Sequence, residues 1–316
     1  MALVGMKTSL LGTRAPEFPK ALPWLNSEPL DMAGLKGKVV LIDFWTYSCV
    51  NCLRTQPFIK KWHEEYASHG LVVVGVHTPE FVFEKSLENV KRAVEDLGIQ
   101  YPVVLDADYK IWNLYANHWW PRKLLVSKQG KIIYDHVGEG GYRETEVEIQ
   151  KALRTGLATP LAFPPVEEEH VHRESGGVCY RTTPELYLGH ERGYIGNPKG
   201  FSRDVPVLFQ DATSHKRHMP YLAGQWLITS EYLEHARETR KFEDYLLLPF
   251  GALQVNLVMR SKDPTPIPLS LSLDGKPLAQ DHKGTDVVLS NGQSVTEVST
   301  PHVSTRKKPR VLGGRT

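Results

Sequence analysis

The stretch from Phe44 to Pro57, "FWTYSCVNCLRTQP", decides how this chain of 316 residues folds. It begins at the end of an apolar, β-branched run, Lys38–Trp45, and its two cysteines, Cys49 and Cys52, are separated by two residues. The same spacing occurs in half of a zinc site and in a dithiol that cycles with a disulfide. The rest of the chain has to distinguish these two kinds of site.

A zinc site would need two further cysteine or histidine ligands. The third cysteine of the chain, Cys179, follows His170 and His172 in "HVHRESGGVC", within a segment whose prolines, glutamates and glycines are typical of a linker. A zinc site would have to combine the Cys49–Cys52 pair with ligands from this linker, an arrangement that the sequence does not favour. We therefore expect no metal ion. Cys179 is interpreted as a buried or loop thiol, with a transient disulfide to the main pair as the alternative.

The dithiol interpretation fits the neighbouring pattern. The run Lys38–Trp45 is typical of a buried strand, and apolar residues on one face between Ile59 and Tyr66 predict a helix that starts near Cys49. A thiol at a helix N-terminus faces unpaired N–H groups and the positive end of the helix dipole, which favour the nucleophilic thiolate. Cys49 is therefore the predicted nucleophile. Cys52, one turn later, is predicted to resolve the mixed disulfide formed at Cys49.

Strands and helices alternate in the first half of the chain. Apolar runs and amphipathic spacing predict strands at 38–45, 71–78 and 101–106, helices at 87–97 and 108–115, a hairpin around "KQG", and a helix from Tyr142. This order indicates an α/β domain over residues 1–157. Residues 158–183 are predicted to be a linker.

The second half, residues 184–316, has a different pattern. Short strand-like runs, among them "QWLITSEYLEHA", "YLLLPFGALQVNLVM", "PIPLSLSL" and "TDVVLS", alternate with turn signals and contain no helical periodicity. In "LDGKP", Leu273–Pro277, the Asp-Gly pair predicts a hairpin turn because both residues tolerate positive φ. The pattern indicates an all-β sandwich that ends in a basic tail.

Residues from about Leu11 to Gly156 resemble the TlpA-like branch of the thioredoxin superfamily. "LGTRAPEF" is similar to the usual entry of redoxin domains, and "DFWTYSCVNC" is similar to the strand followed by a CxxC motif. Pro57, five residues after Cys52, stands where the family has its kinking proline. The helix expected at 87–97 resembles the insertion of the TlpA-like branch. The resemblance implies a thioredoxin fold with this insertion.

The same resemblance implies further site residues. Asp43 stands six residues before Cys49, where thioredoxins have a buried carboxylate that assists proton transfer. Pro121 stands where the family has a cis-proline, which makes Trp120–Pro121 the expected cis bond and exposes backbone groups to a substrate strand. Catalytic roles are thus expected for Cys49, Cys52, Asp43 and Pro121.

Four more side chains are expected near the cysteine pair. Trp45 and Trp120 are neighbours of the site residues in sequence. Glu80 in "HTPEF" either relays protons near the pair or caps the following helix. His118 either borders the active face or packs within its own loop.

The second half resembles the C-terminal domain of DipZ-type proteins, on the segments "TPELYLG", "GQWLI", "VNLVM" and "SLDGKPL". The resemblance implies a jelly-roll sandwich similar to carbohydrate-binding modules. The membrane-spanning module of that family is absent here, so we expect no electron transfer across a membrane by this chain alone. The basic C-terminus stands where a closing apolar strand is expected.

Composition limits the partners. Lys plus Arg number 38 and Asp plus Glu number 36, so the charge balance does not favour nucleic acid or a membrane surface as partner. No apolar run reaches the roughly 20 residues of a membrane span, and no signal peptide is recognisable at the N-terminus. As written, the chain is expected to be cytoplasmic. A trimmed form of an exported protein would look the same.

The leading hypothesis is a thiol-disulfide oxidoreductase acting on protein thiols and disulfides, with no cofactor beyond the Cys49–Cys52 disulfide. The dipeptide between the cysteines, "VN", lacks the histidine of strongly oxidising sites and favours a reductant. A redoxin-type thiol peroxidase is the enzymatic alternative, because Thr46 precedes Cys49 by three residues. Ile42 stands where the peroxidase motif needs proline, which argues against it.

A non-enzymatic interaction protein is the other alternative, with the redoxin half as scaffold. Glycan recognition by its sandwich would need exposed aromatic rings that stack on sugars. The candidates are Tyr187, Tyr194, Trp226 and Tyr232, although Trp226 in "GQWLI" has the pattern of a core residue. Docking of protein partners is the expectation for this half of the chain, and weak glycan binding is its alternative.

Overall fold

The computed structural model describes residues 10–157, 161–166, 182–252, 255–262, 267–284, 287–290 and 293–298. The chain divides into two compact units, Met1–Arg173 and Glu174–Thr316. This division falls inside the segment that the sequence predicts as a linker. The domain boundaries stay a prediction.

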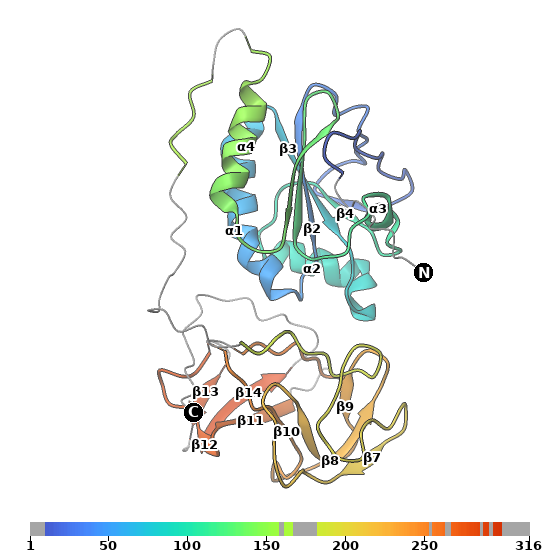
Figure 1. Cartoon of the computed structure of the whole chain (residues 1–316), viewed down its shortest axis with the longest axis vertical. Helices are drawn as coiled ribbons and strands as arrows, with labels where there is room; N and C mark the ends of the chain where they lie inside the picture. The colour runs from blue at the N-terminus through green and yellow to red at the C-terminus, as the bar shows by residue number, and fades with distance from the viewer. Residues whose placement is uncertain are drawn as a thin grey trace, which may run out of the picture. The chain divides into compact units, whose positions relative to one another are not determined.

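The first unit is built on a mixed sheet of six strands in the order β1-β4-β3-β2-β5-β6 (Figure 1). The strands are β1 (Trp24–Leu25), β2 (Val39–Trp45), β3 (Leu71–His77), β4 (Val103–Leu105), β5 (Arg122–Val126) and β6 (Ile132–Val137). β2, β3 and β4 are parallel, whereas β1, β5 and β6 run antiparallel to their neighbours. All seven residues of β2 are buried, as expected for a central strand covered on both faces.

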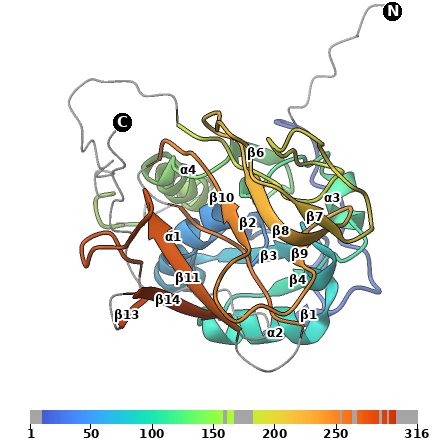
Figure 2. The same ribbon diagram turned by 90° about the horizontal axis from the view of Figure 1, so that it is seen from below.

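Helices connect these strands. They are α1 (Val50–Tyr66), the 3₁₀ turns η1 (Ala67–His69) and η2 (Val82–Lys85), α2 (Leu87–Asp96), α3 (Lys110–Leu114) and α4 (Tyr142–Arg154). α1 and α4 lie side by side on one face of the sheet, and both views show them adjacent (Figures 1 and 2). Phe58 and Tyr142 join them by ring stacking at 3.7 Å. The α/β thioredoxin-like arrangement that the sequence predicts is confirmed for this unit.

The core on the opposite face is formed by β-branched and aromatic residues of the strands together with α3. Phe44 in β2 packs edge-on against Trp112 and Tyr115, at ring distances of 6.1 and 5.7 Å. Because side chains alternate along a strand, Asp43 and Trp45 point to the other face, toward α1 and α4. One face of β2 therefore packs into this core through Phe44, and the other face carries the carboxyl group of Asp43.

The second unit is β-rich. One sheet has the order β10-β8-β7 with β9 paired to β8, and the other has the order β12-β11-β14-β13. The strands are β7 (Val207–Phe209), β8 (Tyr221–Ile228), β9 (Leu233–His235), β10 (Tyr245–Leu247), β11 (Ile267–Leu273), β12 (Lys276–Pro277), β13 (Val288–Ser290) and β14 (Gln293–Val298). All the pairs in these sheets are antiparallel. The jelly-roll arrangement stays a prediction.

Two sequence features of this unit can be followed in its strands. The Asp-Gly hairpin is confirmed, since Asp274 and Gly275 adopt φ of 51° and 73° and join β11 to β12. The strand-like run "YLLLPFGALQVNLVM" contributes the short strand β10 at its start. β10 ends at Leu247, and Pro249 and Gly251 interrupt the apolar run that follows. Proline cannot donate to a strand ladder, and glycine weakens one, so pairing stops there.

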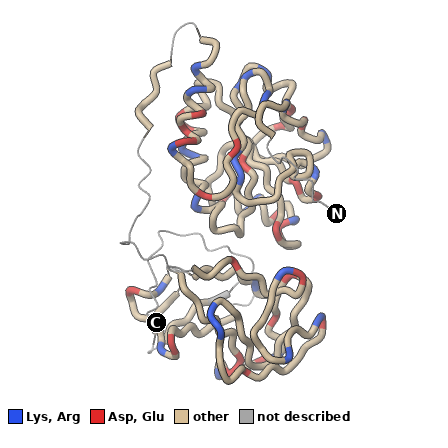
Figure 3. Tube along the Cα trace, in the orientation of Figure 1, with Lys and Arg blue, Asp and Glu red and all other residues tan. Residues whose placement is uncertain are grey.

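Lysines and arginines alternate with acidic residues over both units (Figure 3). Within the part of the chain that the structure describes, no helix is both long and apolar enough to cross a membrane.

Candidate active site at the cysteine pair

Cys49 is the N-cap residue of α1, as the sequence predicts. Its φ and ψ of −75° and 112° are extended, and the Cys52 N–H group donates to Cys49 Sγ at 3.4 Å. The Cys49 carbonyl accepts from Leu53 N at 3.0 Å. Cys49 is half-buried, whereas Cys52 has 0% exposure, and both are free thiols. The first sulfur is therefore accessible at the helix terminus, and the second is enclosed behind it.

Burial dominates the electrostatics of Cys52. It raises the pKa of the Cys52 thiol well above its ordinary value, and the nearby Cys49 and Asp43 raise it further. A thiol with such a pKa does not ionise at neutral pH unless a neighbouring group takes its proton. Attack by a Cys52 thiolate would need a proton acceptor close to this sulfur.

Asp43 is suited to that task. It lies on β2 with 1% exposure, and within the described residues neither carboxyl oxygen has a hydrogen-bond partner. Burial raises the pKa of Asp43 from 3.8 to about 7, and the charge of Lys123 opposes this rise. A carboxyl group with a pKa near neutrality can accept and release a proton under physiological conditions.

Lys123 was not anticipated from the sequence. It stands directly opposite Asp43 in the antiparallel β2–β5 register and has 0% exposure. Its ammonium group donates to the carbonyls of Gly138 and Gly140 at 3.3 and 3.1 Å and lies 5.2 Å from the ring centre of Tyr142. The available signal was a lysine inside the apolar strand "RKLLV", two residues after Pro121, because a charge in a buried strand needs a partner.

Trp45 is fully buried at the end of β2 and packs edge-on against His77 at 5.1 Å. Gly75 on β3 leaves room for it, since a Cβ there would lie 3.0 Å from both Trp45 Nε1 and Tyr101 Cε2. Tyr101 donates to Gln56 Oε1 at 2.5 Å, and its pKa is raised by burial first and by Asp43 next. Aromatic rings thus enclose the carboxyl group and exclude water from it.

The Trp120–Pro121 peptide bond is cis. Pro121 lies directly before β5, and Arg122 pairs with Phe44 of β2, so Pro121 is at the end of the sheet from which the chain continues to Cys49. Trp120 Nε1 donates to the Thr78 carbonyl at 3.0 Å. The role of Pro121 toward a substrate strand stays a prediction.

Glu80 does not cap the following helix, contrary to one sequence interpretation. The N-cap residue of α2 is Ser86, whose hydroxyl accepts from Asn89 N at 3.4 Å. The carboxylate that contacts the cysteine segment belongs to Glu84, which the sequence did not single out. Its Oε1 accepts from Ser48 Oγ at 2.6 Å. His118 is exposed and packs against the ring of its neighbour Trp119 at 5.4 Å.

Several of the four aromatic side chains considered for sugar binding in the second unit pack against other residues. The Arg192 guanidinium lies 3.6 Å from the ring centre of Tyr187, and Trp226 packs against the small core of β7 and β8. Tyr194 and Tyr232 are 40% and 42% exposed. Cys179, His170 and His172 lie outside the described residues. Among the residues that are described, no group of three or more His, Cys, Asp or Glu side chains is arranged to hold a metal ion.

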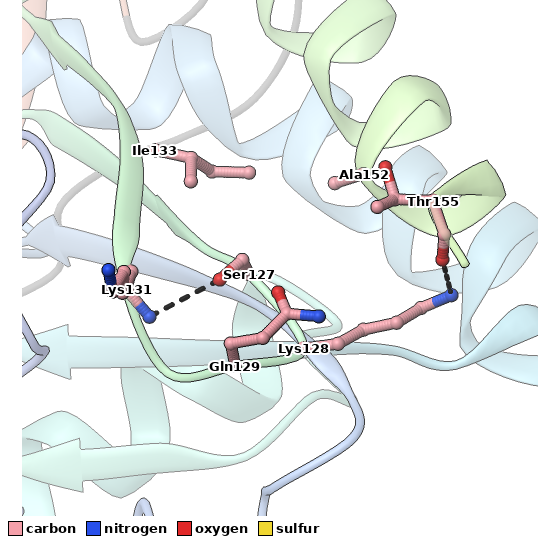
Figure 4. Close-up of a pocket in the computed structure, with 7 residues that line it drawn as sticks. All are labelled: Ser127, Lys128, Gln129, Lys131, Ile133, Ala152 and Thr155. Atoms are coloured by element: carbon pink, nitrogen blue, oxygen red, sulfur yellow. Dashed lines mark hydrogen bonds between the residues drawn. The ribbon is translucent and has the colours of Figure 1, made fainter.

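A hollow on the first unit is lined by Ser127, Lys128, Gln129, Lys131, Ile133, Ala152 and Thr155 (Figure 4). Lys128 donates there to the carbonyls of Leu153 and Thr155 at 2.8 Å, which satisfies the last turn of α4. Gly37, just before β2, donates to the Lys128 carbonyl. The hollow is thus at the start of β2, the opposite end of that strand from Cys49, and is not part of the cysteine site.

Comparison with known protein families agrees with the thioredoxin-like fold of the first unit and with its pair of cysteines. A family model described as Redoxin matches residues 10–153, and one described as Thioredoxin like C-terminal domain matches residues 183–311. The chain therefore carries a redoxin domain followed by a domain of the family described as Thioredoxin like C-terminal domain, and both resemblances indicated by the sequence are confirmed.

Several individual proteins are similar to this chain. Protein DipZ of Mycobacterium tuberculosis (strain CDC 1551 / Oshkosh) is 32% identical over 81% of this chain, which spans 38% of DipZ. Thiol-disulfide oxidoreductase ResA of Bacillus thuringiensis (strain Al Hakam) is 26% identical over 45% of this chain and 78% of ResA. A crystal structure of a thiol:disulfide interchange protein from Chlorobium tepidum TLS matches with a TM-score of 0.39 and 25% identity, over 45% of this chain and 97% of that one.

Proposed function

We propose that the chain is a thiol-disulfide oxidoreductase that exchanges or reduces disulfides of protein partners through Cys49 and Cys52. The observation that carries this proposal is the placement of an accessible Cys49 at the N-cap of α1, with Cys52 fully buried one turn later. The name of the ResA relative supports the same class of reaction.

In the first step, the Cys49 thiolate attacks one sulfur of the partner's disulfide. A bond forms between that sulfur and Cys49 Sγ, the partner's S–S bond breaks, and its second sulfur leaves as a thiolate that takes a proton from water. In the second step, the Cys52 thiolate attacks Cys49 Sγ. The Cys49–Cys52 disulfide forms, and the partner's remaining sulfur leaves as a thiolate. Two electrons pass from the pair to the partner, and the reverse sequence oxidises a partner dithiol.

Asp43 is proposed to accept the Cys52 proton before the second step. Its unpartnered, buried carboxyl group and a pKa of about 7 support this role. Pro121 is proposed to present backbone groups beside Cys49 to an extended segment of the partner. In this proposal, Trp45 and Trp120 close the space around the reacting sulfurs.

The peroxidase alternative has less support. Thr46, its candidate residue, is fully buried and its Oγ1 is joined to His77 Nε2 by a hydrogen bond of 3.3 Å. For the second unit, we propose a docking role on a jelly-roll arrangement of its two sheets, with weak glycan binding as the alternative. The exposed ring of Tyr194 supports the glycan alternative. The rings of Tyr187 and Tyr232 do not, because the guanidinium groups of Arg192 and Arg260 lie over them at 3.6 and 5.8 Å.

Reduction of insulin disulfides with dithiothreitol as electron source tests the leading proposal. The wild-type chain is expected to accelerate the reduction, whereas Cys49→Ser and Cys52→Ser each abolish the acceleration. Cys179→Ser serves as the matched control and is expected to keep the wild-type rate. Acceleration that persists in Cys49→Ser would contradict the assignment. Peroxide consumption far above that of free thiols would favour the peroxidase instead.

A further inference from the structure

Residues 46–48, which lie between β2 and α1, are hydrogen-bonded to the insertion that follows β3. Glu84 in η2 has 1% exposure, and its Oε1 accepts from both Ser48 N at 3.2 Å and Ser48 Oγ at 2.6 Å. Its Oε2 accepts from Glu80 N at 2.6 Å and Phe81 N at 3.0 Å. One buried carboxylate thus joins the residue before Cys49 to a turn that is distant in sequence.

The four donors suit an ionised carboxylate. Burial raises the pKa of Glu84, while the hydrogen bonds from Ser48, Thr46 and the two backbone N–H groups oppose that rise. Hydrogen bonds to a charged acceptor are roughly twice as strong as neutral ones. Because all four groups bonded to the carboxylate are donors, a protonated oxygen or an amide nitrogen in this place would face a donor and lose a bond.

The neighbours of Ser48 are held by the same elements. Tyr47 stacks on His77 of β3, with ring centres 5.5 Å apart, and its hydroxyl donates to the Phe83 carbonyl at 3.4 Å. Thr46 bonds to His77. Burial lowers the pKa of His77 to about 3, so its ring is neutral there. Within this arrangement, Glu84 is the carboxyl group bonded directly to Ser48.

We propose that Glu84 is a positioning residue for the reaction at Cys49. By holding both the backbone N–H and the hydroxyl of Ser48, it fixes the residue from which Cys49 enters the N-cap of α1, and with it the orientation of the sulfur. This inference rests on the proposed function, since it assigns a residue to that reaction. Glu84 does not touch the reacting atoms and acts through Ser48.

Glu84→Gln tests this role in the full chain. It is made in a Cys52→Ser, Cys179→Ser background, so that one sulfur reacts with 5,5′-dithiobis(2-nitrobenzoate). The rate of mixed-disulfide formation at Cys49 is expected to fall about tenfold, the effect of losing a hydrogen bond to a charged group. Glu88→Gln is the matched control, because the Glu88 side chain is 83% exposed, and it is expected to react at the unaltered rate.

A double-mutant cycle separates positioning from a general loss of stability. Ser48→Ala removes the hydroxyl donor and is expected to slow the reaction about threefold. In that background, Glu84→Gln is expected to have a smaller effect on the rate, measured without urea and on chains whose circular dichroism spectra show that they are folded. An equal rate effect in both backgrounds, or an unaltered rate in Glu84→Gln, would overturn the proposal.

If Glu84→Gln does not fold, the reaction rate of Ser48→Ala tests the proposal by itself. A wild-type rate for Ser48→Ala with an unchanged circular dichroism spectrum would then overturn the proposal, and a slower rate with that spectrum supports it. If the proposed function itself is wrong, the measurements give a different result. In that case, the parent chain with Glu84 and Ser48 intact already reacts no faster than a free thiol.

Discussion

Asp43 combines a buried carboxyl group with a pKa of about 7, and both properties have measurable consequences. The folded chain binds this proton more tightly than an unfolded chain with a pKa near 3.8. Stability is therefore lost as the pH rises from about 4 to 7 and Asp43 ionises. A pKa displaced this far corresponds to about 4 kcal/mol of ionisation cost.

Replacement of Asp43 by asparagine removes that cost and adds a buried amide. We expect Asp43→Asn to raise the free energy of unfolding by about 2 kcal/mol at alkaline pH. Near pH 4, where Asp43 is neutral, only the cost of the buried amide remains, and the gain should turn into a loss of about 2 kcal/mol. Urea unfolding followed by tryptophan fluorescence reports on the first unit, which holds six of the seven tryptophans. A gain that is independent of pH would contradict the assigned pKa.

Lys123 lies opposite Asp43 and lowers its pKa. Lys123→Met is expected to raise the pKa of Asp43, since loss of an opposite charge typically shifts a carboxyl by about 1 unit or more. The pH midpoint of the resolving step, measured by stopped-flow release of the partner thiol, should move upward accordingly. The double variant Asp43→Asn/Lys123→Met is the control and should show no midpoint in this range. An unmoved midpoint in Lys123→Met would contradict the coupling.

Residues of the site differ in how well a sequence predicts them. Cys49 and Cys52 follow from local spacing, and Asp43 follows from the resemblance to thioredoxins, which have a buried carboxylate six residues before the first cysteine. Lys123 and Glu84 are distant in sequence from the pair, and only the β2–β5 register and the fold of the insertion bring them to it. Non-local contacts of this kind leave no periodic signal in a single sequence.

Among the elements, β5 is held to β6 by an ion pair and to the segment before it by hydrogen bonds. Arg122 has 1% side-chain exposure and donates to both carboxyl oxygens of Asp135 at 2.8 and 2.7 Å. It also donates to the carbonyls of Tyr115 and Ala116, at 3.2 and 3.3 Å. The guanidinium therefore fixes the chain on both sides of Pro121.

Asp135→Asn would leave the Arg122 charge buried without its partner. We expect the free energy of unfolding to fall by about 3 kcal/mol, as for other broken buried pairs. Glu148→Gln breaks the exposed pair with Lys151 on α4 and should cost less than about 0.5 kcal/mol. Urea midpoints of the two variants give the comparison. Equal losses would show that the buried pair is no stronger than the surface one.

At the scale of elements, strong periodicity and turn chemistry were the reliable signals. The strand before Cys49, the helix after it and the Asp-Gly hairpin all have local causes. The apolar run that begins at Tyr245 contains Pro249 and Gly251, and β10 ends before them, at Leu247. Whether such a run pairs depends on a neighbouring strand, which only the folded chain supplies.

At the scale of the whole molecule, the cysteine site is built entirely from residues of the first unit. Cys49, Asp43, Lys123 and Glu84 all lie within Met1–Arg173. We expect residues 1–173 alone to reduce a small disulfide within about twofold of the full-length rate, because a domain with its own core folds by itself. A larger loss with a small substrate would mean that the second unit contributes to the chemistry.

The central claim is that Cys49 attacks and Cys52 resolves, and trapping a disulfide peptide tests it most directly. The Cys52→Ser, Cys179→Ser chain is mixed with the peptide and analysed by mass spectrometry after proteolysis without reductant. The account predicts a stable adduct on Cys49, and no adduct when Cys49→Ser replaces Cys52→Ser. An adduct on Cys52 in the second chain, or none on Cys49 in the first, would contradict it.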